Sequence, residues 1–280
     1  MNLVKVRYTL VMTLLWWPGV ICAGTPPQEN DTQQVDARFN VSTGPGGSAV
    51  VEFYRRGPFP PVRAGQPDEY VRGIAVQEAG RVVDRWEADH TTIPVFYPGL
   101  NKIWTVRGPN HILITGAVQY GGRFVKLYAL TWSGGKLEAI QEWAGETFSI
   151  KPMGSPSRFV VVVTPEDYSQ IPELYVWDGT KFRLANSEFP EYFSALGARE
   201  ACTIYNSGEK LAPAALVQSC RRSLEAYALA GRPEAGRRAC VQARARIQKG
   251  AGVTWSTPDG FQREGPSAIS EIDGQLEKYR

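Results

Sequence analysis

A strand pattern that occurs three times in the middle of the chain is the strongest constraint on its fold. Each copy has a short strand, a Gly/Pro turn and a second, more apolar strand. The copies span residues 39–54, 103–117 and 148–163. His111 and Arg158 begin the second strand of the last two copies, and they are 47 residues apart. This fixed spacing indicates a repeated structural unit.

The second half of each unit is repeated as well. Residues 124–140, a strand, a tight turn and another strand, correspond to residues 173–185. Residues 70–86 form a weaker first copy, and a loop insertion at residues 58–68 separates it from its first half. Four short strands per copy predict three four-stranded antiparallel sheets that are arranged like propeller blades.

The third copy also carries a resemblance to a known family. Residues 174–182, Leu-Tyr-Val-Trp-Asp-Gly-Thr-Lys-Phe, follow a Val-rich strand and resemble the blades of bacterial secreted FG-GAP/VCBS-type repeat proteins. The resemblance covers roughly residues 39–187 and concerns the pattern. It implies an Asp-rich calcium loop in each repeat, but the corresponding stretch here holds only Glu166 and Asp167. Because calcium takes about six or more oxygen ligands, we expect no calcium in these repeats.

Three copies do not decide whether the sheets close into a propeller. Closed propellers have at least about four blades. Residues 253–263 resemble one more β-hairpin, with Asp259 and Gly260 at its turn. This hairpin would supply part of a fourth sheet or cover an open edge. The alternative is an open stack of antiparallel sheets, or a sandwich.

After Pro190 the pattern becomes helical. We expect helices over residues 191–206, 212–230 and 233–248, the last two forming a hairpin around Gly231. Apolar residues three and four positions apart give each helix of the hairpin one apolar stripe: Val217, Cys220, Leu224 and Tyr227 in the first, and Cys240, Ala243 and Ile247 in the second. The hairpin resembles a single tetratricopeptide-type unit, which cannot bury its own face, so we expect it to pack against the strand region.

The cysteines of this hairpin predict a disulfide. Cys220 and Cys240 lie at equal distances from Ala230 in the turn, and both lie on the stripes that face each other. Exported cysteines usually pair, and this placement suits a disulfide between these two residues. A bond from Cys202 to either partner is the alternative, and one cysteine is left over in each case.

The hairpin is also strongly basic, with a net charge of +6 over residues 211–250. The candidate residues for binding an anionic partner are Arg221, Arg222, Arg237, Arg238, Arg244 and Arg246. Lipid head groups, a polysaccharide or an acidic protein would suit such a face. The alternative is a helix face that is simply solvated.

The beginning of the chain predicts export. Lys5 and Arg7 precede an uncharged, mostly apolar run at residues 8–23, which ends at the small residue Ala23. Because the run is short for a transmembrane helix and contains Pro18, we expect a cleaved signal peptide; an uncleaved anchor is the alternative. The protein is then periplasmic or extracellular, with no transmembrane segment in the mature chain. Without the two basic residues, the net charge falls from +3 to about +1, which favours no nucleic-acid partner.

Catalytic chemistry has little support in the sequence. Asp89 and His90 could form a relay with Ser48 or Ser155, but the Gly-x-Ser-x-Gly pattern is missing. His111 occupies the same repeat position as Arg158, which indicates a structural role. The spacing of the two histidines and the cysteines fits no zinc site, and there is no glycine-rich phosphate loop. We therefore expect no catalytic residues, no metal and no cofactor.

Two residue classes leave alternatives open. The carboxylates Asp84, Glu87, Glu166 and Asp167 are available for a glycosidase pair, which can come from distant segments. The tryptophans of the repeats are Trp86, Trp104, Trp132, Trp143 and Trp177. We expect them to pack between blades, although tryptophans near turns can also stack on sugars or grip peptides.

These patterns predict an exported protein of two parts. A signal peptide at 1–23 and a flexible segment at 24–35 precede a propeller-like β domain at 36–189, with repeats at about 39–102, 103–147 and 148–189. The helical region at 190–280 contains a terminal β-hairpin at 252–264. The fold class is mainly β with a C-terminal helical region, α+β.

The leading functional hypothesis is a non-enzymatic binding or scaffolding protein of the cell envelope. Its partner would be an envelope protein, an anionic surface or a polysaccharide. The alternative hypothesis is a secreted, glycan-directed hydrolase that uses carboxylates from the blade loops.

Overall fold

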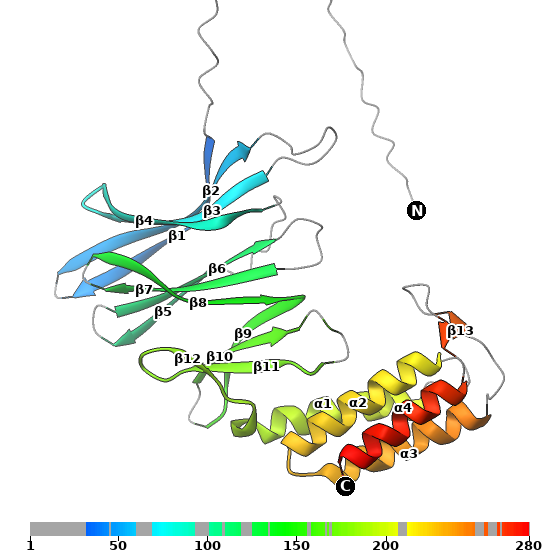
Figure 1. Ribbon diagram of the computed structural model, residues 1–280. Helices are drawn as coiled ribbons and strands as arrows, with labels where there is room; N and C mark the ends of the chain where they lie inside the picture. Colours follow the sequence, from blue (N-terminus) through cyan, green and yellow to red (C-terminus); the bar gives the residue numbers. More distant parts are fainter. Residues whose placement is uncertain are drawn as a thin grey trace, which may run out of the picture. The chain divides into compact units, whose positions relative to one another are not determined.

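The computed structural model describes residues 32–44, 46–59, 69–92, 101–107, 110–118, 125–133, 135–155, 158–165, 167, 170–206, 212–249, 255–256, 262–263 and 265–279. Over these residues, three four-stranded antiparallel sheets are followed by four helices (Figure 1). The prediction of a mainly β fold with a C-terminal helical region is therefore confirmed.

Each sheet is a meander in which strands consecutive in sequence pair with each other. The first sheet contains β1 (Thr32–Gly44), β2 (Gly47–Phe59), β3 (Glu69–Glu78) and β4 (Arg81–Thr92). The second contains β5 (Lys102–Arg107), β6 (Asn110–Val118), β7 (Val125–Ser133) and β8 (Lys136–Gly145). The third contains β9 (Thr147–Met153), β10 (Arg158–Thr164), β11 (Glu173–Trp177) and β12 (Phe182–Leu184). Each predicted repeat thus forms one sheet.

The first sheet differs from its prediction at two ends. Strand β1 begins at Thr32, so residues 32–35, which we expected to be flexible, belong to the strand. Strand β2 continues to Phe59, into the predicted loop insertion, whose residues 60–68 lie outside the described part of the chain. Strand β1 is longer because its backbone pairing with β2 continues through Thr32, Gln33 and Gln34, which carry no apolar signal. Strand β2 is longer because Phe59 pairs with Glu69 of β3.

The first and second sheets pack against each other through apolar side chains. Side chains alternate between the two faces of a strand. Val51, Phe53 and Ile74 of the first sheet form one buried cluster with Leu113 and Leu130 of the second. This cluster forms a core that buries one face of the first sheet.

The second sheet is apolar on both faces. Ile112 and Ile114 lie on the face opposite to Leu113, and they form a cluster with Val161 and Val163 of the third sheet. This explains why β6 has a continuous apolar run, which is typical of a strand buried on both sides. The second sheet therefore lies between the other two.

The other face of the third sheet is covered by helices. The helices are α1 (Pro190–Asn206), α2 (Pro213–Leu229), α3 (Pro233–Lys249) and α4 (Gly265–Lys278), preceded by the short η1 (Asn186–Glu188). Val160, Val162 and Leu174 of the sheet form a buried cluster with Phe193 of α1 and Ala226 of α2. Ala226 belongs to the predicted helical hairpin, so the hairpin packs against the strand region through α2.

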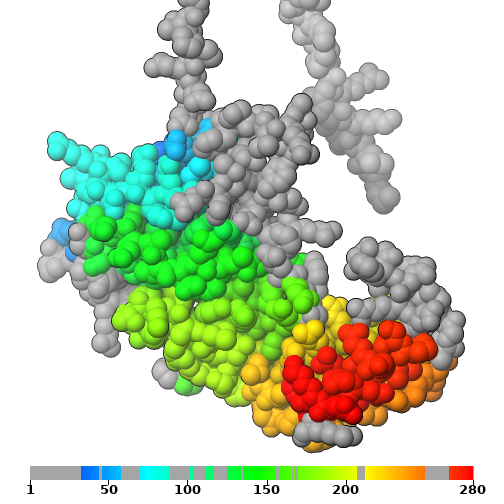
Figure 2. All heavy atoms as spheres, viewed as in Figure 1, coloured from blue at the N-terminus to red at the C-terminus, as the bar shows by residue number. Residues whose placement is uncertain are grey.

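The apolar stripes of the hairpin are buried mainly against other helices. Figure 2 shows the atoms of the C-terminal helices, in yellow to red, gathered in one group. Leu224 of α2 and Ile247 of α3 share one core with Ile204 of α1 and with Ala268 and Ile272 of α4. The sequence did not lead us to expect α4, which supplies part of this core. Strands β13 (Trp255–Ser256) and β14 (Gln262–Arg263) form the expected terminal hairpin.

One ion-pair cluster connects strands of the third sheet with the turn that leads to the helices. Arg158 of β10 donates to Glu188 of η1 at 2.6 Å, and Arg183 of β12 pairs with the other carboxylate oxygen. The hydrogen bonds from Arg183 and then Arg158 lower the pKa of Glu188 to about 2. The carboxylate therefore remains charged in the folded protein well below the pH at which it would titrate in the unfolded chain.

This depressed pKa gives an acid-dependent contribution to stability. In an unfolded chain a glutamate has a pKa of about 4.3, so the contribution is present above that pH and is lost as the pH falls toward 2. Because the groups are partly exposed, we expect Glu188→Gln to lower the free energy of unfolding by about 0.5–1 kcal/mol at pH 7 and by much less at pH 2. Urea unfolding across this range would measure it, with the exposed Glu138→Gln as control. An equal loss at both pH values would contradict the prediction.

Candidate functional site

The first sheet has one apolar face and one polar face. Val51 and Phe53 of β2 point toward the second sheet, so Glu52 and Tyr54 lie on the opposite side, which we call the outer face. Its other members are Arg38 and Asn40 of β1, Val50 and Arg56 of β2, Gly73, Ala75 and Gln77 of β3, and Arg85 and Glu87 of β4. Ion pairs between neighbouring strands cross this face. The contacts between sheets are instead mainly apolar, so this face does not resemble a surface that packs against a fourth blade.

The outer face is hollowed where β1, β2 and β3 run side by side. The hollow has a volume of about 590 Å³, within the range of roughly 300–1,000 Å³ that is usual for ligand sites. We call it the sheet hollow. It is lined by Gln33, Val35, Arg38, Asn40, Val50, Glu52 and Gln77.

A buried carboxylate lies in this hollow. Glu52 is only 5% exposed, and its Oε1 accepts a hydrogen bond from Arg38 Nε at 2.6 Å. Among the residues that the structure describes, Arg38 is the one partner of the Glu52 side chain. The Arg38 side chain is itself largely exposed, and both residues of the pair line the hollow.

A second polar cluster, formed by Tyr54, Arg56 and Glu87, lies on the outer face beside the hollow. The hydroxyl of the fully buried Tyr54 donates to Glu87 Oε1 at 2.8 Å. Arg56 donates to both oxygens of Glu87, at 2.9 and 2.7 Å. Burial, and then the hydrogen bond to Glu87, raise the pKa of Tyr54 above its ordinary value, while the Arg56 hydrogen bonds lower the pKa of Glu87. Tyr54 therefore stays a neutral donor and Glu87 a charged acceptor at neutral pH.

The absence of a side chain at Gly73 makes room for the Tyr54 ring. A Cβ atom at Gly73 would overlap the ring of Tyr54, which pairs with Gly73 across the two strands. We expect Gly73→Ala to lower the free energy of unfolding by about 1–3 kcal/mol, the usual cost of overpacking. In a Tyr54→Ala background the same substitution should cost much less, because the overlapping atoms are gone. Equal costs in both backgrounds, measured by urea unfolding, would contradict this explanation.

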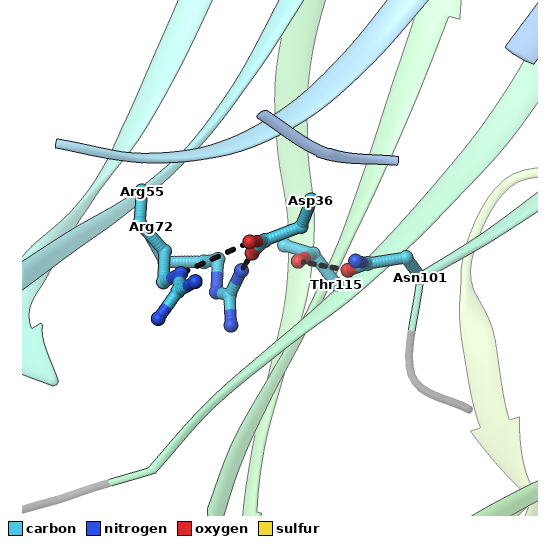
Figure 3. Close-up of polar contacts among 5 residues, drawn as sticks. All are labelled: Asp36, Arg55, Arg72, Asn101 and Thr115. Atoms are coloured by element: carbon cyan, nitrogen blue, oxygen red, sulfur yellow. Dashed lines mark hydrogen bonds and ion pairs between the residues drawn. The ribbon is translucent and has the colours of Figure 1, made fainter. Parts of the chain in front are cut away.

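The contact between the first and second sheets ends in a buried polar cluster (Figure 3). Asp36 lies at a bulge in β1, between Val35 and Ala37. It accepts a hydrogen bond from Arg55 Nε at 3.0 Å and forms an ion pair with Arg72. Figure 3 shows Thr115 of β6 in the same region, donating to Asn101 at 2.8 Å.

This cluster has more positive than negative charge. One carboxylate serves two arginines, and Arg72 is only 7% exposed. Burial lowers the pKa of Arg72, and the Asp36 carboxylate acts in the opposite direction. Arg72 Nε is buried and has no hydrogen-bond partner. Without Asp36, the positive charges of Arg55 and Arg72 would therefore destabilise the folded protein.

Most of the arginines predicted to bind an anionic partner contact neighbouring helices. Arg244 donates to both oxygens of Asp273 in α4, at 2.7 and 3.2 Å. Arg222 pairs with Glu200 of α1 at 3.1 Å. The others are Arg221 with Glu225 of its own helix, Arg237 with the carbonyls of Leu276 and Tyr279, and Arg246 with the carbonyl of Tyr205. Arg238 is exposed on α3. These contacts explain the basic residues as connections between helices, and the anionic partner stays a prediction.

The predicted cysteine pair is brought together. Cys220 and Cys240 are fully buried, with their sulfur atoms at disulfide distance and their Cα atoms 4.7 Å apart. Cys202 is exposed and free on α1.

Of the residues considered for catalysis, the structure places Asp84 and Glu87 on opposite faces of the first sheet. Asp84 accepts a hydrogen bond from the backbone N–H of Leu137 in the second sheet, at 2.6 Å, whereas Glu87 lies on the outer face. Asp167 is exposed, and Glu166 and the side chain of His90 lie outside the described part of the chain. Ser48 and Ser155 are exposed. Within the described ranges no three His, Cys, Asp or Glu side chains form a group that could hold a metal ion.

Histidine and tryptophan side chains of the repeats lie in the core. The buried His111 lies 3.0 Å, through Nε2, from the carbonyl of Ser42, and its ring stacks on Trp132 at 5.4 Å. Trp132 and Trp143 are buried in the two contacts between sheets. These two tryptophans therefore pack between sheets; Trp86 and Trp177 are half-buried, and the side chain of Trp104 lies outside the described part.

A comparison of this chain with known protein families, curated proteins and solved structures finds no match. The resemblance to FG-GAP/VCBS-type repeats therefore depends on the strand pattern. In the described part of the chain, no helix is both long enough and apolar enough to cross a membrane. The sequence did not point to the sheet hollow, although Arg38 and Asn40 alternate with apolar residues in a way that indicates one polar strand face.

Proposed function

We propose that this protein is an exported, non-enzymatic binding protein of the cell envelope and that its ligand site is the sheet hollow. The observation that carries the proposal is Glu52, a buried carboxylate in a hollow of ligand size. Both faces of the second and third sheets are used for packing, whereas the outer face of the first sheet is polar. A concavity on which a few polar groups converge is the usual arrangement of a binding site.

Export is supported by the sequence of residues 1–23 and by the cysteine pair. A signal pattern followed by cysteines at disulfide distance is typical of proteins that fold in an oxidising compartment. We expect residues 1–23 to direct a fused alkaline phosphatase out of the bacterial cytoplasm, where that reporter becomes active. A fusion that begins at residue 24 is the control, and equal activity of the two fusions would contradict export by this segment.

Binding can be separated from hydrolysis with the purified protein and envelope extract. The protein is immobilised, the retained molecules are identified, and wild type is compared with Glu52→Gln and Gln77→Ala. Gln34→Ala is the control, because Gln34 is exposed on the same strand as Gln33 but does not line the hollow. We expect a retained molecule that both hollow variants lose and the control keeps.

The hydrolase alternative has its own readout. Release of reducing ends from envelope polysaccharides would be measured for wild type and for Asp84→Asn, Glu87→Gln and Glu52→Gln. Turnover that disappears with one of these substitutions, in a variant that remains folded, would overturn the non-enzymatic proposal.

A further inference from the structure

The chemistry of the sheet hollow indicates a class of ligand, and we propose that the hollow binds a neutral, hydroxyl-rich glycan chain. This inference rests on the proposed function, because it assigns a ligand to the same site. It goes further in excluding an anionic polymer as the ligand of this face.

The uncharged polar side chains among the described lining residues are all carboxamides. Gln33, Asn40 and Gln77 line it, and each carboxamide offers both a hydrogen-bond donor and an acceptor. A sugar hydroxyl is likewise a donor and an acceptor, so each carboxamide can satisfy it in either direction. A ligand with only one kind of hydrogen-bonding group would leave half of these groups unmatched.

The two charged groups favour a ligand without charge. Among the described lining residues, Arg38 and Glu52 are the charged ones, and they form an ion pair at 2.6 Å, so their charges balance. An anionic ligand would meet the buried Glu52 carboxylate, and a cationic ligand would meet Arg38. Hydroxyl groups can instead donate to Glu52 and accept from Arg38, and hydrogen bonds to charged groups are stronger than those between neutral groups.

The register of the strands arranges these groups in rows. Asn40, Val50 and Gln77 lie directly opposite one another on β1, β2 and β3. They form a row across the strands in which an apolar side chain lies between two carboxamides. The next row along the strands contains Arg38 and Glu52. Neighbouring strands are about 5 Å apart and successive rows about 7 Å apart. A chain lying across the strands would place hydroxyls on both amides and an apolar C–H face on Val50.

The test is the binding of purified protein to a panel of soluble oligosaccharides. Neutral probes are maltohexaose, cellohexaose, laminarihexaose, chitohexaose and mannohexaose; anionic probes are heparin and polygalacturonate. Saturation-transfer NMR and calorimetry would be measured at low and high salt. We expect at least one neutral probe to bind, with an affinity that changes less than about twofold with salt, because no counterions are released.

Substitutions connect this binding to the hollow. Asn40→Ala, Gln77→Ala and Glu52→Gln should each weaken binding about tenfold, which corresponds to the loss of roughly one hydrogen bond. Gln34→Ala should leave the affinity unchanged. Thermal unfolding and near-ultraviolet circular dichroism would show that each variant is folded, and Asn40→Ala and Gln77→Ala replace exposed or half-exposed side chains.

The outcomes distinguish this inference from the proposed function. No binding to any neutral probe, stronger binding of the anionic probes, or neutral binding that the hollow variants do not change would each overturn the glycan assignment. If the envelope experiment still retains a molecule that needs Glu52 and Gln77, the binding function stands while the ligand class is wrong. If no molecule of any kind depends on these residues, both proposals fall.

Discussion

Replacing Asp36 by alanine is expected to lower the free energy of unfolding by about 3–5 kcal/mol, the largest effect we expect from a single substitution in the described sheets. Asp36 is the shared partner of Arg55 and Arg72 in the contact between the first two sheets. Its removal leaves two arginines at a buried position without a counter-charge, and Arg72 Nε already lacks a partner. The lost ion pairs matter less than the uncompensated charges that remain.

Urea unfolding at neutral pH would measure this effect, with a matched set of variants. Asp36→Asn keeps the shape but removes the charge, so it should lose most of the same stability. Replacing all three residues by apolar ones, Asp36→Leu with Arg55→Met and Arg72→Met, should recover much of the loss, because no unpaired charge is left. A loss below about 1 kcal/mol for Asp36→Ala would show that the two arginines are compensated by other groups.

The three sheets could be predicted because their signals are local. Alternating apolar residues and Gly-containing turns specify each meander without knowledge of the rest of the chain, as in residues 124–140. The hollow and the Asp36 cluster depend on register. The bulge between Val35 and Ala37 decides which face Arg38 occupies, and a shift of one residue would reverse it. No local pattern in the sequence predicts that bulge.

The helical region shows a different limit. The arginines predict a basic surface because several of their partners are far away in sequence: Arg244, for example, pairs with Asp273 of α4, 29 residues further on. Helix α4 was missed because it has few large apolar residues, and Gly265 and Gly274 lower its helical propensity. Its helical state depends on burial of Ala268 and Ile272 against the other helices. The charge density of one segment therefore does not show which of its charges are paired within the protein.

Reduction of the Cys220–Cys240 pair is expected to lower the free energy of unfolding by about 3 kcal/mol, since the bond closes a loop of 20 residues in the unfolded chain. Both cysteines lie in the core that α2 and α3 share with α1 and α4, so the loss should be seen first in the helical signal. Circular dichroism during urea unfolding, with and without a reductant, would measure it, and the double substitution Cys220→Ala with Cys240→Ala should behave like the reduced protein. Cys202→Ser is the control and should change nothing, because that cysteine is exposed and free. A linked peptide containing Cys202, found by mapping without reduction, would replace this pairing with the alternative.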